Sequence, residues 1–375
     1  MGRQQGSLLI EIMISMAIGI FLMTGALQVL LTTKQNFLAR ETLTSVETNG
    51  SLAMNLLASE IRMAGYRGCA AANRDALIGT SSLNGYYSAA SLDVNIGIRG
   101  WEYNNTDINS TLNPENWVQT SSFNSGNWLT GGVDTAQAAT AGKSTSGSDF
   151  TIARESDVLR LWSVEPYVMD IQSANDTSLT ANPATMTNFP DSSDSNPERL
   201  LIVYDCETTV LVKATRFNHS SGTVTLSDTI PSVTSLLSTM NSPQAMMLRM
   251  VQYSLEIPSY TNRPSLYRRE LKVDGDFKQK VEVLPGVINM QVLYGENLYG
   301  STNANAYLRA NEVSDWKKVV SVRLWILTES ANDMVIPASS PVVYYGNTYT
   351  INDRRIRREF MMTVTLRNRA LGDWS

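Results

Sequence analysis

The sequence predicts an α+β protein, in which one long N-terminal helix packs on a mainly antiparallel β-sheet domain with long loop insertions. Two observations lead to this fold. Apolar residues recur at helical spacing through the first 64 residues, and after residue 150 short β-branched runs alternate with polar tracts. A chain of 375 residues with 43% hydrophobic and 17% charged residues can bury a sizeable core, so we do not expect wholesale disorder.

Charge and composition narrow the function. A formal charge of -5 argues against a general nucleic-acid binder, which needs a basic surface. The single histidine, His219, argues against histidine-dependent catalysis and against a multi-histidine metal site. The sequence has neither a G-x-S-x-G nucleophile elbow nor a complete phosphate-binding loop. We therefore expect a protein that is not an enzyme and that carries no cofactor or metal.

The first half of the helix is long and apolar enough to cross a membrane. Residues 7–31 carry one charge, Glu11. The 24 residues from Leu8 span roughly 36 Å at about 1.5 Å per residue, against a hydrocarbon core of about 30 Å. A secretory signal has a shorter apolar stretch and a small-residue exit, and N-myristoylation needs Ser or Thr in place of Gly6. We therefore expect a membrane-spanning segment over residues 7–31.

The second half of the helix, residues 32–68, is amphipathic. Apolar residues recur at steps of three and four, with charged residues between them, at Leu43, Val46, Ala53, Leu57, Ile61 and Ala64. Gly65 and Gly68 supply stop signals. We predict one continuous helix from about Leu8 to Ala64, whose second half lies against the β domain.

The residues around Gly6 resemble the leader of type IV prepilins and pseudopilins. The polar residues 1–6 end in Gly6, which is followed by Ser7, three apolar residues and Glu11. The resemblance implies that an inner-membrane prepilin peptidase cuts between Gly6 and Ser7 and methylates the new amine of Ser7. It also implies that Glu11 compensates the amine of a neighbouring subunit. A carboxylate within a membrane costs about 2.5–3.5 kcal/mol, so it is normally paired or functional. The alternative is that Glu11 lies near the interface and reaches water.

Two polar tracts interrupt the β region, at 78–149 and 173–197. The first could be a sugar- or partner-binding loop, but we favour a loop-rich insertion whose aromatic residues anchor it to the body. We expect the second tract to be a solvated linker. The aromatic residues of the first tract are Trp101, Tyr103, Trp117, Phe123 and Trp128.

Ten short runs are predicted as strands because they are rich in β-branched residues and several of them alternate apolar and polar positions. Asp274-Gly275 is a plausible hairpin turn between two of them. The runs are Asp157–Trp162, Leu200–Asp205, Thr209–Arg216, Thr223–Leu226, Met247–Ile257, Ser265–Val273, Val281–Leu284, Ile288–Tyr294, Val319–Leu327 and Arg357–Leu366.

The β body resembles PilW-type minor pilins. The similar segments are RESDVLRLW (154–162), ERLLIVYDC (198–206), RPSLYRREL (263–271), VLPGVINMQVLYG (283–295), VVSVRLWIL (319–327) and RREFMMTVTLRNR (357–369). With the leader, they cover the helix and most of the body, but not the two polar tracts. The resemblance implies a pilin-like fold, divided into a leader 1–6, a membrane half 7–31, an amphipathic half 32–68 and a periplasmic head 69–375.

The two cysteines, Cys69 and Cys206, are 137 positions apart. Because the head would lie outside the inner membrane, where thiols oxidise readily, we expect a disulfide that clamps the helix to the sheet. On the chain-entropy model, closing this loop stabilises by roughly 5 kcal/mol. The alternative is two free or separately buried thiols.

The C-terminal segment contains six arginines. They could contact DNA or an acidic neighbouring subunit, but we expect the solvated flank of an edge strand, because charges protect such edges from aggregation. The arginines are at 354, 355, 357, 358, 367 and 369.

The resemblance implies a minor pilin that primes or caps type IV pilus assembly and supports twitching motility. Its implied partners are the major pilin, other minor pilins, a tip adhesin, the inner-membrane assembly platform and the prepilin peptidase. It would lie in the inner membrane of a Gram-negative bacterium and later at the pilus tip, without specific nucleic-acid binding. One alternative is a minor pseudopilin of a type II secretion system. Another is a membrane-anchored glycan- or DNA-binding module that uses Trp101, Trp117 and Trp128.

Overall fold

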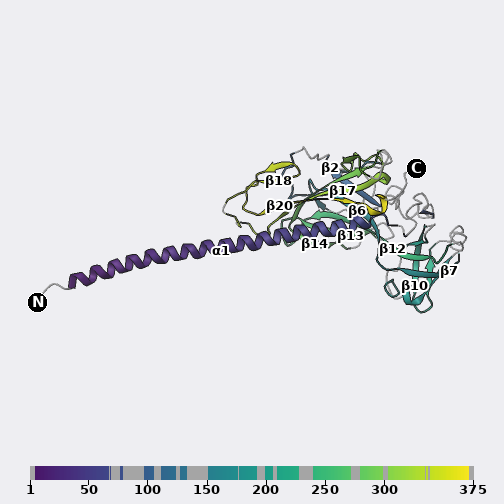
Figure 1. The fold of residues 1–375 in the computed structure, drawn as a ribbon, viewed down its shortest axis with the longest axis horizontal. Coiled ribbons are helices and arrows are strands. Elements are labelled where there is room, and N and C mark those ends of the chain that lie inside the picture. The colour runs from purple at the N-terminus through teal and green to yellow at the C-terminus, as the bar shows by residue number, and fades with distance from the viewer. Residues whose placement is uncertain are drawn as a thin grey trace.

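The protein consists of a long helix that projects from a β-rich head (Figure 1). The computed structural model describes residues 5–66, 68, 77–78, 97–104, 111–123, 127–132, 151–175, 177–191, 199–205, 209–227, 240–271, 279–298, 303–333, 335–336 and 338–370. The predicted α+β class, with one long N-terminal helix and a mainly antiparallel β domain, is confirmed.

The helix α1 runs from Gln5 to Met63 without interruption. Five of its six predicted apolar stripe positions are buried, and only Leu43 is half-buried. The helix ends where glycine permits a left-handed conformation, because Gly65 has φ +72° and its N–H donates to the Trp162 carbonyl at 2.8 Å. The predicted end of the helix is thus confirmed to within one residue.

The body of the head is built from two sheets that meet along the packed half of α1. The four-stranded sheet has the order β16-β15-β17-β20. Its strands are β15 (Val287–Glu296), β16 (Ala306–Leu308), β17 (Val319–Glu329) and β20 (Arg357–Thr365). The body strands of the second sheet are β2 (Ile98–Tyr103), β4 (Trp128–Leu129), β6 (Val158–Val164), β12 (Gln244–Glu256), β13 (Ser265–Leu271) and β14 (Val281–Pro285).

The core of the body lies between these sheets and α1. Gly286, with φ +78°, turns the chain from β14 of one sheet into β15 of the other. The helix fills the space between them, since Leu57 and Ile61 are fully buried in one cluster with residues from both sheets. Short elements complete the body: β3 (Thr120–Ser122) pairs with β5 (Thr151–Ala153), β18 (Val342–Tyr344) pairs with β19 (Asn347–Tyr349), and α4 (Arg367–Ala370) follows β20.

Residues 169–247 form a second module, the distal barrel, at the end of the head farthest from the N-terminus (Figure 1). Six antiparallel strands pair in a closed ring: β12 with β9, β9 with β10, β10 with β11, β11 with β8, β8 with β7, and β7 with β12. Phe189, Phe217 and Met169 belong to its separate apolar core. The strands are β7 (Met169–Asn175), β8 (Ser178–Ala181), β9 (Arg199–Tyr204), β10 (Thr209–Asn218), β11 (Thr223–Leu226) and the first part of β12.

All ten predicted runs form strands, but the second polar tract differs from expectation. The solvated linker at 173–197 is wrong in its first part, because β7 and β8 and the 3-10 turn η3 (Pro183–Thr185) lie there. In these strands Leu179 and Ala181 alternate with polar residues and face the barrel core. The tract 78–149 contributes β2, β3 and β4, and its start follows β1 (Leu77–Ile78), which pairs in parallel with β10.

Candidate assembly surface

The N-terminal half of α1 is an apolar surface that the head does not cover. Its most apolar 18-residue window has a mean hydropathy of 2.1, and none of that window is buried. Phe21 is 79% exposed and Leu22 is 66% exposed. By length and composition the helix can cross a membrane, which agrees with the sequence-based prediction.

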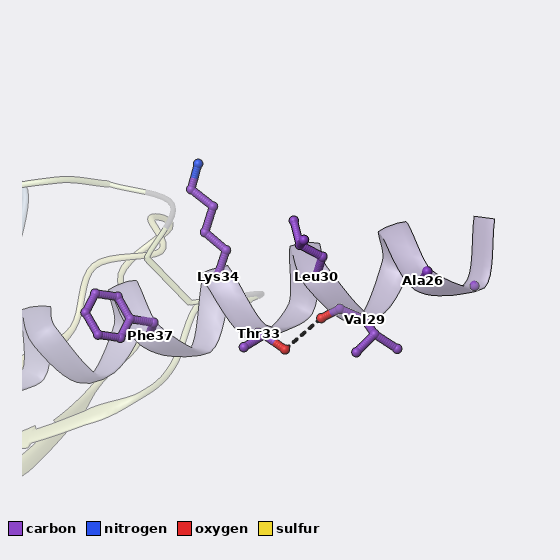
Figure 2. A pocket seen from close by; sticks show the side chains of 7 residues that line it. Ala26, Val29, Leu30, Thr33, Lys34 and Phe37 are labelled. Atoms are coloured by element: carbon purple, nitrogen blue, oxygen red, sulfur yellow. Dashed lines mark hydrogen bonds between the residues drawn. The ribbon is translucent and has the colours of Figure 1, made fainter. Parts of the chain in front are cut away.

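One face of this half is shown in Figure 2. All seven of its lining residues come from α1, so it is an open helix face and not an enclosed cavity. The Thr33 hydroxyl donates to the Val29 carbonyl at 2.8 Å, and Thr24 and Thr32 bond the carbonyls four residues earlier in the same way. These hydroxyls are therefore satisfied within the helix and add little cost to burial in lipid or against another helix. The face consists of Gly25, Ala26, Val29, Leu30, Thr33, Lys34 and Phe37.

Glu11 lies in this exposed half. Its side chain is exposed, and within the described part of the chain no hydrogen bond or ion pair reaches it. Gly6 and Ser7 lie in the first turns of α1. The structure describes only their backbone conformation. The chain itself thus provides no described partner for the one charge in its apolar segment.

Cys69 and Cys206 lie outside the described residues, but the residues beside them lie close together. A Cβ on Gly68 would fall 2.1 Å from a ring carbon of Tyr204, so the Tyr204 ring lies directly against the backbone of Gly68. Tyr66 and Tyr204 stack edge to face with ring centroids 6.5 Å apart. The end of α1 and the end of β9 are therefore neighbours in the fold.

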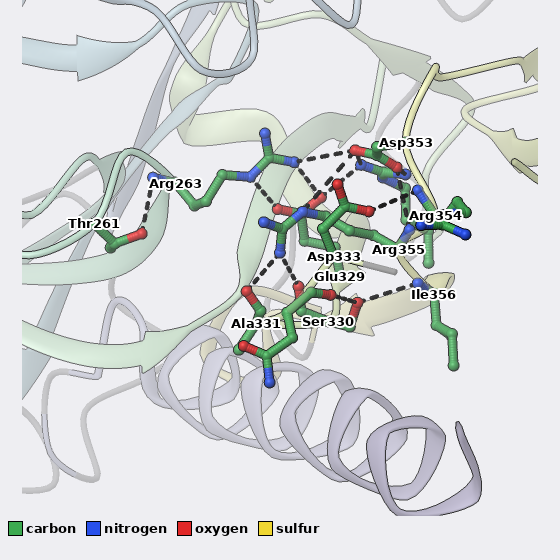
Figure 3. Close-up of polar contacts among 12 residues, drawn as sticks. Thr261, Arg263, Glu329, Ser330, Ala331, Asp333, Asp353, Arg354, Arg355 and Ile356 are labelled. Carbon is green, nitrogen blue, oxygen red and sulfur yellow. Dashed lines mark hydrogen bonds and ion pairs between the residues drawn. The ribbon is translucent and has the colours of Figure 1, made fainter. Parts of the chain in front are cut away.

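The described end of the head nearest to the exposed helix half is held by a cluster of charged residues, the polar clamp (Figure 3). Glu329 is almost fully buried and accepts from Arg263 and Arg357, the latter at 2.8 Å. Arg357 also donates to both oxygens of Asp353 at 2.6 Å. Arg355 donates to the backbone carbonyls of the turn after β17. The clamp joins the β12–β13 loop, the end of β17 and the start of β20.

The prediction that the C-terminal arginines form a solvated flank is wrong for Arg357, which belongs to the clamp. β20 is an edge strand, since it pairs only with β17 among the described strands, but only 4% of the Arg357 side chain is exposed. Arg358 fits the expectation better, being 55% exposed and 3.9 Å from Glu47 on α1. No local pattern in the sequence indicates the clamp, because Arg263 and Glu329 are 66 positions apart.

The aromatic residues of the tract 78–149 are buried anchors. Trp101 and Trp128 are fully buried, and Trp128 donates from its ring nitrogen to the Ser156 carbonyl at 2.9 Å. Trp117 packs edge to face on Tyr344. The interpretation as an insertion anchored to the body agrees with these contacts. A glycan- or DNA-binding site that presents Trp101, Trp117 and Trp128 is not supported, because these side chains do not reach the surface.

Residues 252–368 match the family model of PilW, the type IV pilus-assembly protein W. No curated protein gives a significant match. Among solved structures the chain is similar to a type IV-like pilin from Thermus thermophilus, with 19% identity and a TM-score of 0.20, over 46% of this chain and 85% of that one.

The match runs from within β12 to the start of α4 and so includes the four-stranded sheet and all five named residues of the polar clamp. The distal barrel lies entirely before it. The predicted resemblance is therefore confirmed: over residues 252–368, the C-terminal part of its head, this chain matches the PilW family of type IV pilus-assembly proteins.

Proposed function

We propose that this chain is a minor pilin that primes or caps the assembly of type IV pili. The observation that carries the proposal is the bare apolar half of α1, which holds one charge and is joined to a head that matches a pilus-assembly family. Burying this surface is favourable by about 25 cal/mol per Å², so it requires either lipid or other helices. A subunit that first lies in the inner membrane and later packs in a filament meets both conditions in turn.

The proposed maturation uses the first residues of the chain. A prepilin peptidase removes residues 1–6 by cutting between Gly6 and Ser7, and then methylates the amine of Ser7. Residues 7–31 form the membrane or filament-core half, 32–68 the amphipathic half, and 69–375 the periplasmic head. Glu11 forms an ion pair with the amine of a neighbouring subunit as the helix leaves the membrane, which relieves the cost of a carboxylate in an apolar setting.

The proposed partners are the major pilin, other minor pilins, a tip adhesin and the assembly platform of the inner membrane of a Gram-negative cell. A minor pseudopilin of a type II secretion system would use the same helix physics. The match to a pilus-assembly family favours the pilus. Deletion of the chain should therefore remove surface pili and leave protein secretion intact.

The N-terminal peptide tests the maturation. Mass spectrometry of the protein from membranes should give a mature chain that begins at Ser7 and carries one methyl group on its amine. Gly6→Ala should leave a full-length precursor in the inner membrane. A mature start at another residue, or an intact Met1, would contradict the proposal.

Glu11 is tested by comparison with a second glutamate of the same helix. Glu11→Leu should still be cleaved but should fail to enter filaments, because the neighbouring amine then has no counter-charge. Glu41 is also exposed on α1 but lies outside the apolar segment, so Glu41→Leu is the matched control and should enter filaments normally. Equal incorporation of both variants would refute the ion pair.

We propose in addition that Cys69 and Cys206 form a disulfide. Contacts of Tyr204 with Gly68 and Tyr66 support this proposal, because they bring the segments next to both cysteines together. A peptide map without reductant should contain the two cysteine peptides as one linked species. Two separate peptides carrying free thiols would contradict it.

A further inference from the structure

The distal barrel is attached rigidly to the end of α1. Strand β12 is continuous through both modules, since Gln244–Leu248 pair with β9 and Leu248–Tyr253 pair with β6. Arg249 of β12 donates to both carboxylate oxygens of Glu60 on α1, at 2.8 and 3.0 Å, and to the Ser163 hydroxyl. These contacts, with the Tyr204 contacts described above, fix the barrel relative to the helix.

The described part of the barrel has no open strand edge and no cavity within its apolar core, and a polar pocket of about 320 Å³ lies at its junction with the body, where Asn188, Arg199 and Arg249 line it. Its six strands pair in a closed ring, and β1 pairs in parallel with the start of β10, so every strand of the barrel has described neighbours on both sides. Its interior is filled by its own apolar core, in which Val203, Val212 and Phe217 are fully buried. We therefore expect a module of this kind to act by steric exclusion of neighbouring subunits.

The position of the barrel relative to α1 decides which neighbouring subunits it would obstruct. Figure 1 shows it beyond the C-terminal end of α1, on the side of the helix opposite to the four-stranded sheet. The face of α1 turned away from the sheets is the one left for other helices. A bundle of helices on that side would therefore meet the barrel at its end.

We propose that the distal barrel is a steric end stop, which lies across the end of the helix bundle and prevents a further pilin from stacking there. This inference rests on the proposed function, because it requires α1 to pack with other pilin helices. It assigns the capping role to residues 169–247, whereas the region that matches the pilus-assembly family, 252–368, belongs to the body.

The register between β6 and β12 allows the barrel to be deleted while the pairing of these two strands is kept. Glu165 donates its N–H to the Met247 carbonyl at 2.8 Å, directly beside the pair Val164 and Leu248. Replacing residues 166–246 by Asn-Gly joins Glu165 to Met247 as a two-residue hairpin. The deletion removes Cys206, so the variant also carries Cys69→Ala. The full-length chain with Cys69→Ala and Cys206→Ala is the matched control.

The test follows the position of the subunit in purified pili, with immunogold label directed at the body. The control should label filament ends only, and the barrel-free chain should shift label from the ends to the shafts. Label that stays at the ends would overturn the end stop and leave the pilin function intact. A wild-type chain absent from every filament would instead overturn the proposed function.

An insertion covers the case in which the deletion variant does not fold. A small folded tag between Ser220 and Ser221, in the exposed β10–β11 turn, enlarges the barrel without touching its core. An end stop has no pilin stacked on it, so the tagged chain should reach filament ends with the tag open to antibody. Loss of the tagged chain from filaments, with normal levels in the membrane, would overturn the proposal.

Discussion

The two halves of α1 differ in apolar content and have opposite surroundings. In the C-terminal half Leu57 and Ile61 are fully buried against the two sheets. In the N-terminal half Leu22 and Leu30 are 66% and 62% exposed. The amphipathic half finds its partners within the chain, whereas the uniformly apolar half finds none among the described residues. The pattern of charge around a helix thus distinguishes a surface that completes a fold from one that awaits lipid or a second subunit.

The largest expected effect is a difference in head stability between leucines of the two halves. Leu57→Ala should lower the free energy of unfolding of the head by about 2–5 kcal/mol, because it leaves a cavity in the core of the body. Leu22→Ala should leave it unchanged, because Leu22 touches no part of the head. Urea unfolding of the full-length protein in detergent, followed by tryptophan fluorescence, measures both. Equal losses would show that the membrane half contributes to the head, against the comparison.

Carboxyl groups extend the comparison, because the head supplies partners that the bare half lacks. Asp157 and Glu102 are buried and hydrogen-bonded to one another, and Asp157 accepts from the Val292 N–H at 2.8 Å. Two carboxyl groups share a hydrogen bond only if one of them is protonated. Burial raises the pKa of Asp157 to about 8, while hydrogen bonds from the backbone and from Glu102 oppose this rise. Asp157 is therefore stabilised by a proton shared with Glu102.

The buried pair makes head stability depend on pH. Between about pH 4 and pH 8 the folded head holds a proton that the unfolded chain has released, so stability falls as pH rises by up to about 1.4 kcal/mol per unit. Asp157→Asn keeps an acceptor for Val292 and replaces the shared proton by an amide donor. Urea unfolding at pH 5 and pH 8 should therefore show the variant gaining on the wild type at the higher pH. A constant difference between the two proteins would contradict the shared proton.

Asp353 of the polar clamp provides a control in which head stability depends on pH in the opposite direction. Burial would raise its pKa, but hydrogen bonds and the positive charge of Arg357 hold the pKa below its usual range. The folded head therefore binds this proton less readily than the unfolded chain, and the stabilisation is lost as pH falls through the pKa. Asp353→Asn should cost stability at pH 7, and this cost should shrink below about pH 4. The two aspartates thus respond to pH in opposite directions, because Asp157 is stabilised in the fold by a shared proton and Asp353 by the side chain of Arg357.

Much of the fold follows from local pattern. The length and end of α1 and the ten strand runs could be predicted, because helical and strand periodicity and the glycines after Ala64 are local signals. The burial of the tract aromatics was also expected. The strands β7 and β8 were missed because six of their eleven residues are polar, and only pairing with β11 and β12 gives them a core.

What could not be predicted depends on distant partners. The barrel closes through pairs between β7 and β12 that are 74 and 76 positions apart, and the polar clamp joins Arg263 to Glu329. Nothing in the neighbourhood of Asp157 indicates that its carboxyl group meets Glu102 in the core. Such contacts follow from topology, which periodicity does not specify. The roles of Gly6, Ser7 and Glu11 depend on other proteins and remain predictions.

Two glycines give the smallest test of the comparison. A Cβ on Gly50 would fall 2.0 Å from the ring of Phe360 on β20, whereas a Cβ on Gly25 meets nothing within 4 Å. Alanine favours a helix over glycine by about 1 kcal/mol at either site. At Gly50 the displacement of the Phe360 ring, at about 1–3 kcal/mol, should exceed this gain, so Gly50→Ala should lower the urea midpoint of the head. Gly25→Ala should leave that midpoint unchanged, because the helix face around it carries no part of the head. If Gly25→Ala nevertheless reduces incorporation into pili while the head stays intact, the bare face is a close-packed helix contact, where the missing side chain allows a neighbouring helix to approach.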